Sequence, residues 1–257
     1  MKPTQDLLRA ENISLTFSNG NGGLHVLDSI SLEVSPDEFV CIVGPSGCGK
    51  TSLLRILAGL LEPSSGQVVF SGERLARPQR RIGFVFQQAN LMPWRTALNN
   101  ICLPLELAGL AREEKQDRAS SLIELMGLQG FEEMYPRDLS GGMAQRVAIG
   151  RALVHEPDVL LLDEPFGSLD ALTRERMGEE LLRIWKAHRG TLLMVTHSIP
   201  EAVLLADRVI VLSDRPARVV LNLEIPIPRP RSIDLTYTEE FGVLAAQIRG
   251  AIRAVVE

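Results

Sequence analysis

A glycine-rich segment directly after a short apolar run constrains the fold of this chain more than any other feature. The segment, residues 44–51, reads Gly-Pro-Ser-Gly-Cys-Gly-Lys-Thr and follows Phe39–Val43. The apolar run is typical of a buried strand, and Thr51–Ala58 is typical of a helix. A strand, a glycine-rich turn and a helix in this order form a P-loop, whose backbone N–H groups surround phosphate oxygens. The chain is therefore predicted to have an α/β fold with a P-loop core.

The composition is that of a globular chain with a slight excess of acidic residues. Of the 257 residues, 45% are hydrophobic and 23% are charged, and the net charge is −5. This length fits one large domain with a small appendage. An acidic balance disfavours binding to the phosphate backbone of nucleic acids, so no nucleic-acid partner is expected. Three cysteines without the spacing of a disulfide framework favour a reduced, cytosolic protein.

Apolar patterns predict the elements around the P-loop. Residues 7–17 and 24–35 alternate apolar and polar side chains, which predicts two antiparallel strands. Residues 96–127 are predicted to be mostly helical, with interruptions near Pro104 and Gly109. Buried or short strands are further expected at 81–86, 159–162 and 191–195 and twice within 207–225, and helices at 170–188 and 238–256.

Two carboxylates, Asp163 and Glu164, directly follow the apolar run Val159–Leu162. Successive strand residues point to opposite faces, so the two acids are expected to have different roles. Beside a P-loop, Asp163 is predicted to hold Mg²⁺, directly or through water, and Glu164 to orient or deprotonate the attacking water. Lys50 is predicted to reach the β- and γ-phosphates, and the Thr51 hydroxyl to ligate Mg²⁺.

The order of the motifs resembles the ATPase subunit of ABC transporters. After the P-loop come Gln87, Leu139-Ser140-Gly141-Gly142-Met143, Asp163-Glu164, Ser168-Leu169-Asp170 and His197. The resemblance covers about residues 7–225, which implies one ABC-type ATPase domain followed by a C-terminal appendage over 226–257. It implies a mixed sheet, an N-terminal antiparallel β subdomain, and an inserted α-helical subdomain, about 88–156, that carries the Ser-Gly-Gly signature.

The resemblance also implies ATP and Mg²⁺ as cofactors and assigns residues to them. The implied catalytic residues are Glu164, His197, Gln87 and Lys50. The implied ligands of Mg²⁺ are Thr51, Gln87 and Asp163. The implied nucleotide-binding residues are Phe17, Gly44, Pro45, Ser46, Gly47, Cys48, Gly49, Lys50, Thr51, Ser52, Ser140, Gly142 and Asp170.

Several of these residues would act between two copies of the chain. Ser140 and Gly142 would bind the γ-phosphate of an ATP held by the other copy, which implies a homodimer with two buried nucleotides. Asp170 would couple the two sites. Met143 departs from the pattern, because the family most often has glutamine there.

The remaining assignments have plainer alternatives. Gln87 would contact Mg²⁺ or the attacking water and sense a membrane partner, whereas a lone glutamine is usually a solvated side chain. His197 would contact the γ-phosphate, whereas a lone histidine at a strand end is more often structural. Phe17 would stack on adenine, where tyrosine is commoner in the family, whereas an aromatic residue in an early strand is otherwise part of the core.

The segment Leu91–Asn100 resembles the ATPase subunits of nitrate, sulfonate and taurine importers, which often contain its Pro93-Trp94 pair. Trp94 and Leu98 would contact an integral-membrane permease; alternatively, Trp94 packs within its own subdomain. ATP hydrolysis would then energise uptake of a small anion, delivered by a periplasmic or extracellular solute-binding protein. The sequence shows no evident signal peptide and no apolar run near the ~18 residues that span a bilayer. The chain is therefore expected to lie peripherally at the cytoplasmic face of the membrane.

Two other functions use the same ATPase core. One is a non-transport ABC ATPase that acts on DNA or ribosomes. Ribosome-acting forms usually have two ATPase units and DNA-repair forms have long coiled coils, and neither pattern is evident in this sequence. The other is a lipid-handling or efflux subunit.

Overall fold

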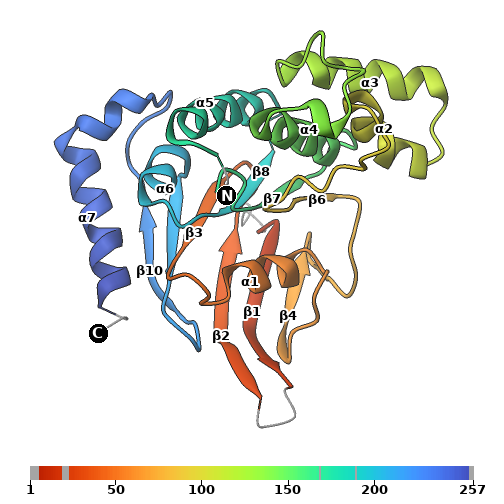
Figure 1. The fold of residues 1–257 in the computed structure, drawn as a ribbon. Coiled ribbons are helices and arrows are strands. Elements are labelled where there is room, and N and C mark those ends of the chain that lie inside the picture. Colours follow the sequence, from red (N-terminus) through yellow and green to blue (C-terminus); the bar gives the residue numbers. More distant parts are fainter. Residues whose placement is uncertain (1–5, 19–22, 168, 189, 255–257) are drawn as a thin grey trace, which may run out of the picture. The chain divides into compact units, whose positions relative to one another are not determined.

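The computed structural model describes residues 6–18, 23–167, 169–188 and 190–254. The chain divides into two compact units. The first contains the residues up to Gln79 together with those from Thr191 onward, and the second is Arg80–Gly190. Figure 1 shows the elements of both units, which are described separately below.

The first unit contains an antiparallel sheet, as the alternating N-terminal pattern predicts. Its strands are β1 (Leu8–Phe17), β2 (Leu24–Val34), β4 (Ser65–Phe70) and β5 (Glu73–Arg74), in the order β2-β1-β4-β5. Along the second half of β2, buried Ile30, Leu32 and Val34 alternate with more exposed residues, so one face of the strand packs on the core. The sequence pattern did not indicate β4 and β5, because β5 has only two residues and β4 begins with Ser-Gly-Gln.

The same unit contains the mixed sheet that positions the P-loop. Its strands are β3 (Phe39–Val43), β8 (Thr191–Val195), β9 (Arg208–Leu212) and β10 (Val219–Glu224). β3 pairs in parallel with β8 and β9, whereas β10 is antiparallel to β9. Every residue of β3 and β8 is buried, which is why both strands read as continuous apolar runs.

The described part of the first unit also contains three α-helices: α1 (Lys50–Leu57), α6 (Ile199–Leu205) and α7 (Glu239–Arg253). α7 is the amphipathic helix expected near the C-terminus. It buries Phe241, Leu244 and Ile248 and packs against α6 and β9. A short 3₁₀ helix, η2 (Ile233–Tyr237), precedes it. The segment after β10 is therefore packed onto the strands and helix α6 of its unit.

The second unit combines two parallel strands, β6 (Ile82–Val85) and β7 (Val159–Asp163), with several helices. The helices are α2 (Ala97–Leu107), α3 (Arg112–Leu125), η1 (Pro136–Asp138), α4 (Gly141–Leu153) and α5 (Ala171–His188). α2 packs against α3 and α4, and α4 packs against β6. The expected interruption near Pro104 is wrong, because α2 continues through this proline and buries Ile101 and Leu105 on either side of it. Among the described residues, no helix is both long and apolar enough to cross a membrane.

Candidate functional site

The P-loop, residues 44–49, joins β3 to α1 in the first unit. Gly47 and Gly49 have φ values of 78° and 117°, a region that glycine enters without steric cost. A Cβ on Gly49 would also lie 2.7 Å from Val26 Cγ1 and 2.9 Å from Leu27 Cδ2. The loop is therefore pressed onto β2, and only glycine fits at position 49.

Lys50 is the first residue of α1 and is only 4% exposed. Its Nζ donates hydrogen bonds to the carbonyl oxygens of Gly44, at 3.0 Å, and Pro45, at 2.8 Å. An ammonium group carries three hydrogens, so a third remains for a phosphate oxygen. Burial raises the pKa of the neighbouring Cys48 thiol, so the cysteine inside the loop is a neutral thiol at neutral pH.

His197 lies at the same sheet edge as the P-loop. β3 and β8 run in parallel with Ile42 opposite Val195, and the Thr196 N–H donates to the Ile42 carbonyl oxygen at 3.1 Å. The residues that follow both strands therefore emerge together. His197 is exposed at this edge, whereas Thr196 before it is buried.

Phe17 is at the end of β1, and 39% of its surface is exposed. The alternative that this ring belongs to the core is therefore wrong. Thr51 and Ser52, in the first turn of α1, are half-buried. The first unit thus contains the P-loop residues, Phe17 and His197.

The second unit brings together Gln87, Asp163 and Glu164. Val85 of β6 lies opposite Leu162 of β7, so the residues after both parallel strands share one edge. Asp163 is only 2% exposed, whereas Glu164 is half-buried and has a φ of 44°, which is uncommon for a residue other than glycine.

Gly167 lies between two of these polar side chains. A Cβ on Gly167 would lie 3.5 Å from Glu164 Oε2 and 3.8 Å from Gln87 Nε2. The two side-chain ends therefore converge on the space beside this glycine. The sequence alone did not indicate this convergence, because it joins residues 87 and 167, which are 80 positions apart.

The Ser-Gly-Gly signature forms the N-terminus of α4, also in the second unit. Ser140 is the exposed N-cap residue, and its Oγ accepts a hydrogen bond from the Met143 N–H at 3.3 Å. Met143 thus takes part in the N-cap of α4 through its backbone N–H. Gly142 is buried, and a Cβ there would lie 3.2 Å from Thr173 Cγ2 of α5.

Asp170 lies close to the signature through this contact. Its Oδ1 accepts a hydrogen bond from the Thr173 N–H at 3.1 Å, and hydrogen bonds from Thr173 lower the pKa of the Asp170 carboxyl group. Asp170 therefore accepts a hydrogen bond from the first turn of α5, as Ser140 does from the first turn of α4. Ser168 of the same motif lies outside the described residues.

A fixed loop of the second unit exposes Trp94, which is 70% accessible to solvent. Asn100 is fully buried and holds this loop: its Oδ1 accepts from the Met92 N–H at 2.8 Å, and its Nδ2 donates to the carbonyl oxygens of Met92, Arg95 and Thr96. The alternative that Trp94 packs within its own subdomain is wrong. The sequence indicated no role for Asn100, the last residue of the Leu91–Asn100 segment.

Other exposed apolar residues lie beside this loop. The N–H groups of Ala97 and Leu98 donate to the carbonyl oxygens of Met134 and Glu132, so the 131–135 segment lies next to the start of α2. Phe131, Met134 and Tyr135 are each 36–40% exposed. Trp94, Phe131, Met134 and Tyr135 form what we call the Trp94 surface.

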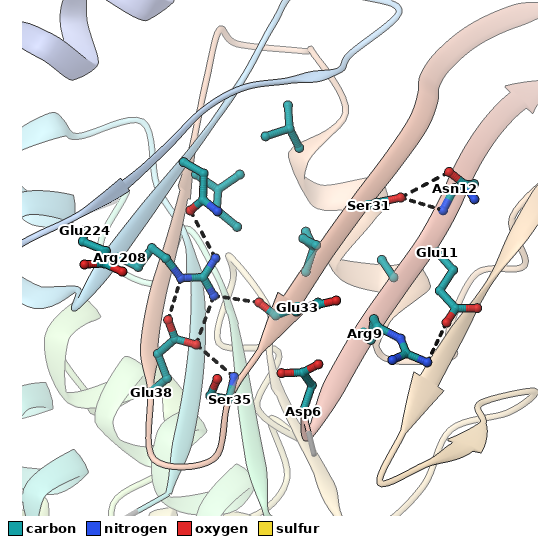
Figure 2. A pocket seen from close by; sticks show the side chains of 15 residues that line it. Asp6, Arg9, Glu11, Asn12, Ser31, Glu33, Ser35, Glu38, Arg208 and Glu224 are labelled. Carbon is teal, nitrogen blue, oxygen red and sulfur yellow. Dashed lines mark hydrogen bonds and ion pairs between the residues drawn. The ribbon is translucent and has the colours of Figure 1, made fainter. Parts of the chain in front are cut away.

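The first unit also has a polar pocket of about 850 Å³ between its two sheets, shown in Figure 2. Arg208 lies in it and donates to Glu38 Oε1 at 2.6 Å, to the Glu33 carbonyl oxygen and to Asn222 Oδ1. Arg9 pairs with Glu11 in the same pocket. Glu38 precedes β3 whereas the P-loop follows it, so this pocket lies at the other end of the strand and contains none of the predicted site residues.

The chain is similar to known ATP-binding proteins over most of its length. A family model described as ABC transporter matches residues 27–167. An uncharacterized ABC transporter ATP-binding protein of Methanocaldococcus jannaschii is 48% identical over 87% of this chain and 84% of its own. The aliphatic sulfonates import ATP-binding protein of Bacillus cereus is 43% identical over 86% of each chain. The nitrate import ATP-binding protein of Synechocystis sp. is 45% identical over 86% of this chain and 83% of its own.

Two solved structures share the fold. One is described as the dimeric post-hydrolysis state of an ATP-binding cassette bound to ADP and Pi; its TM-score is 0.76 at 33% identity, over 86% of this chain and 100% of the other. The second, described as a dimeric bacterial ABC transporter cassette, has a TM-score of 0.77 at 34% identity and the same coverage. They confirm the α/β fold with a mixed sheet and an antiparallel β subdomain. With its P-loop, its signature and these similarities, the chain belongs to the ABC transporter family, among its ATP-binding proteins.

Proposed function

We propose that this chain is the ATP-hydrolysing subunit of an importer and that it works as a homodimer beneath a separate permease. The observation that carries the ATPase assignment is the convergence of Gln87 and Glu164 beside Gly167, next to the buried Asp163. The names of the sulfonate and nitrate import relatives support uptake of a small anion, such as nitrate, a sulfonate or taurine.

The P-loop would hold the phosphates of ATP. Backbone N–H groups of residues 46–51 and the N-terminus of α1 favour an anion, and the Lys50 ammonium group adds a full positive charge. Phe17 is exposed and offers a ring face on which adenine could stack. His197, at the edge shared with the P-loop, would contact the γ-phosphate.

The residues fit Mg²⁺ by the chemistry of their donors. The Thr51 hydroxyl, the Asp163 carboxylate and the Gln87 amide oxygen are all hard oxygen ligands, the type that Mg²⁺ takes together with phosphate oxygens. Mg²⁺ bound there would neutralise charge on the β- and γ-phosphates. Glu164 would orient the attacking water and accept its proton, with Gln87 holding the same water from the other side of the space beside Gly167.

The signature would complete the site of a second copy. Ser140 is exposed at the N-terminus of α4, a helix of 13 residues, and this end attracts anions. The Ser140 hydroxyl keeps its hydrogen for a phosphate oxygen, because its oxygen is the acceptor in the cap. Asp170, beside it, would link the two nucleotides across the dimer, and the dimeric solved cassettes support this arrangement.

The permease would bind the Trp94 surface. Tryptophan is among the residues that contribute most to protein interfaces, and exposing one at 70% is unfavourable without a partner. The chain would then lie at the cytoplasmic face of the membrane, and a solute-binding protein would deliver the anion to the permease from the other side.

The experiment is reconstitution of the chain with its permease in liposomes that enclose MgATP. Nitrate, taurine and an alkyl sulfonate are added outside, each with a solute-binding protein, and phosphate release is measured. We expect one of these anions to stimulate hydrolysis and to accumulate inside the liposomes. Failure to co-purify with any permease would contradict the transport assignment, whereas efflux of the added solute would contradict import.

A further inference from the structure

The short helix α6 begins at Ile199, two residues after His197. Ser198 is its N-cap, and the Thr196 Oγ1 accepts from the Ser198 N–H at 3.0 Å and donates to Glu201 Oε2 at 2.6 Å. The turn that contains His197 is therefore tied on both sides to the first turn of α6. A shift of this helix moves His197 with it.

The other end of α6 is held by two arginines of the C-terminal segment. The last four carbonyl groups of a helix have no partner inside it. Here Arg229 Nη2 donates to the Leu205 oxygen at 2.5 Å. Arg231 Nη1 contacts the oxygens of Val203, Leu204 and Ala206, at 3.1, 3.4 and 2.6 Å. The two guanidinium groups thus donate hydrogen bonds to the carbonyl oxygens of all four residues 203–206. Positive charge at this end of the helix is also stabilised by the helix dipole.

Arg231 is bound in an unusual way for a charged residue. It is only 7% exposed, and all five of its hydrogen bonds go to backbone carbonyl oxygens, including those of Ile225 and Ile227. Arg229, by contrast, pairs with the Asp207 carboxylate at 2.8 Å. Burial lowers the pKa of Arg231 to about 10, so its guanidinium group still carries its charge at neutral pH. A buried cation whose hydrogen bonds all go to carbonyl oxygens is costly, so the site is more than a solvated helix end.

The C-terminal segment is itself anchored to the same unit. Ile225 donates its N–H to the Asp207 carbonyl oxygen at 2.8 Å, and α7 packs against α6 through a face that buries Phe241 and Leu244. α6 has only seven residues, too few to be stable alone. Its position is therefore determined by what holds its two ends.

We propose that residues 226–254 position His197 through α6, with Arg231 as the main positioning residue and Arg229 as its support. This inference rests on the proposed function, since it takes His197 as the residue that contacts the γ-phosphate. Holding the carbonyl end of α6 keeps the Thr196–Ser198 turn at a fixed place on the edge it shares with the P-loop. The C-terminal segment then acts on hydrolysis without touching the nucleotide.

The experiment compares the full-length chain with Arg231→Met, Arg231→Lys and Arg229→Met, measuring kcat and KM for MgATP. We expect Arg231→Met to lower kcat about tenfold or more with little change in KM, because small displacements of a positioned group affect the chemical step most. Lysine should restore part of kcat by keeping the charge. Arg249→Met, an exposed arginine of α7, is the matched control and should behave as wild type. If Arg231→Met does not fold, Arg231→Lys and Arg229→Met should still lower kcat, to a smaller extent.

A double-mutant cycle with His197→Ala separates positioning from general stability. If Arg231 acts through His197, Arg231→Met lowers kcat in the wild type but not further in His197→Ala. An equal factor in both backgrounds, or a lower Tm with an unchanged kcat, overturns the inference. A wild-type kcat in His197→Ala also overturns it but leaves the ATPase proposal intact, because that proposal is tested independently by Glu164→Gln.

Discussion

At the scale of single residues, Glu164 has a backbone conformation that glutamate seldom adopts. Glu164 has a φ of 44° and directly follows β7, whose last residue, Asp163, is buried. Such left-handed conformations in residues other than glycine cost roughly 1–3 kcal/mol and are concentrated at functional sites. In this conformation the Glu164 carboxylate and the Gln87 amide both lie beside Gly167. We propose that Glu164 acts on the attacking water from this position.

Replacing Glu164 with Gln should therefore separate ATP binding from hydrolysis. Glutamine has nearly the same shape but cannot accept a proton, so we expect hydrolysis to fall by about 10²-fold or more. ATP binding should persist, and a closed dimer should accumulate, as seen by size-exclusion chromatography with MgATP. Near-normal phosphate release would remove Glu164 from the role of base.

Gly49→Ala should be strongly disruptive. The φ of 117° is unfavourable for alanine, and the new Cβ would lie 2.7 Å from Val26 Cγ1. We expect a loss of about 1–3 kcal/mol in the free energy of unfolding, together with weaker ATP binding. Gly109→Ala is the control, because Gly109 also has a positive φ, 77°, but no atom within 4 Å of the added Cβ. Equal losses in Tm for the two variants would show that the contact with β2 is unimportant.

Residues of the site could be predicted when they belong to one continuous motif. The P-loop glycines, Asp163 and Glu164 follow apolar strands directly, so local pattern was sufficient to place them. Gly167 was different, because its importance comes from Gln87, a side chain 80 positions away. Asn100 was also different, because its hydrogen bonds to three nearby carbonyl groups depend on how the loop folds. The exposure of Phe17 also required the structure, since its neighbours in β1 alternate like those of a core strand.

At the scale of elements, the loop before α2 is rigid although it exposes a large apolar ring. Asn100 binds the carbonyl oxygens at residues 92, 95 and 96, and Thr96 caps α2 by accepting from the Asn99 N–H. A surface that is fixed in advance loses little conformational entropy on binding. The Trp94 surface is therefore suited to a partner that docks as a preformed helix or loop.

Trp94→Ala should weaken binding to the permease without affecting the fold. We expect Tm to stay within a few degrees of wild type, because the ring is 70% exposed, and permease affinity to fall by about 30-fold or more. The measurement is the fraction of chain retained by tagged permease in detergent. Leu60→Ala, another exposed apolar residue but in the first unit, is the control. Normal retention of the Trp94 variant would place the permease contact elsewhere.

The predicted elements agree with the structure where the periodicity was strong. The strands at 39–43 and 191–195 and the helix near the C-terminus lie where expected. β5 was missed because two residues show no period. The break expected at Pro104 is wrong because a proline's low helix propensity reflects the hydrogen bond it cannot donate. In α2 the buried residues on either side of Pro104 keep the helix continuous despite this loss.

At the scale of the whole molecule, the proposed active site is divided between two copies of the chain. One copy would contribute the P-loop, and the other would contribute Ser140 and Gly142. The order of the motifs was sufficient to predict the family. No single motif is specific to the family, but their combination is. The transported anion has no such signature, since in the proposed assembly the ATPase never contacts it.

A mixed dimer tests this division directly. Lys50→Ala should impair ATP occlusion because it removes a contact with the phosphates. Ser140→Arg should impair ATP occlusion because the larger side chain blocks the signature. Combined in one dimer, they leave one intact composite site and one site with both defects. We expect purified mixed dimers to occlude about one nucleotide per dimer, because the N-terminus of α4 in one copy would bind the phosphate held by the other. The measurement is filter binding of labelled ATP. Occlusion no higher than in either single variant would contradict the in-trans geometry.

The buried thiols have a practical consequence for following this protein in motion. All three cysteines, Cys41, Cys48 and Cys102, are buried, and burial raises the pKa of each thiol. Because alkylating reagents attack the thiolate, the native chain should react slowly with maleimides. A cysteine introduced at Tyr237, which is 87% exposed, would then be labelled selectively. A fluorophore attached there would report on the C-terminal segment during each ATP cycle, with the natural cysteines left in place.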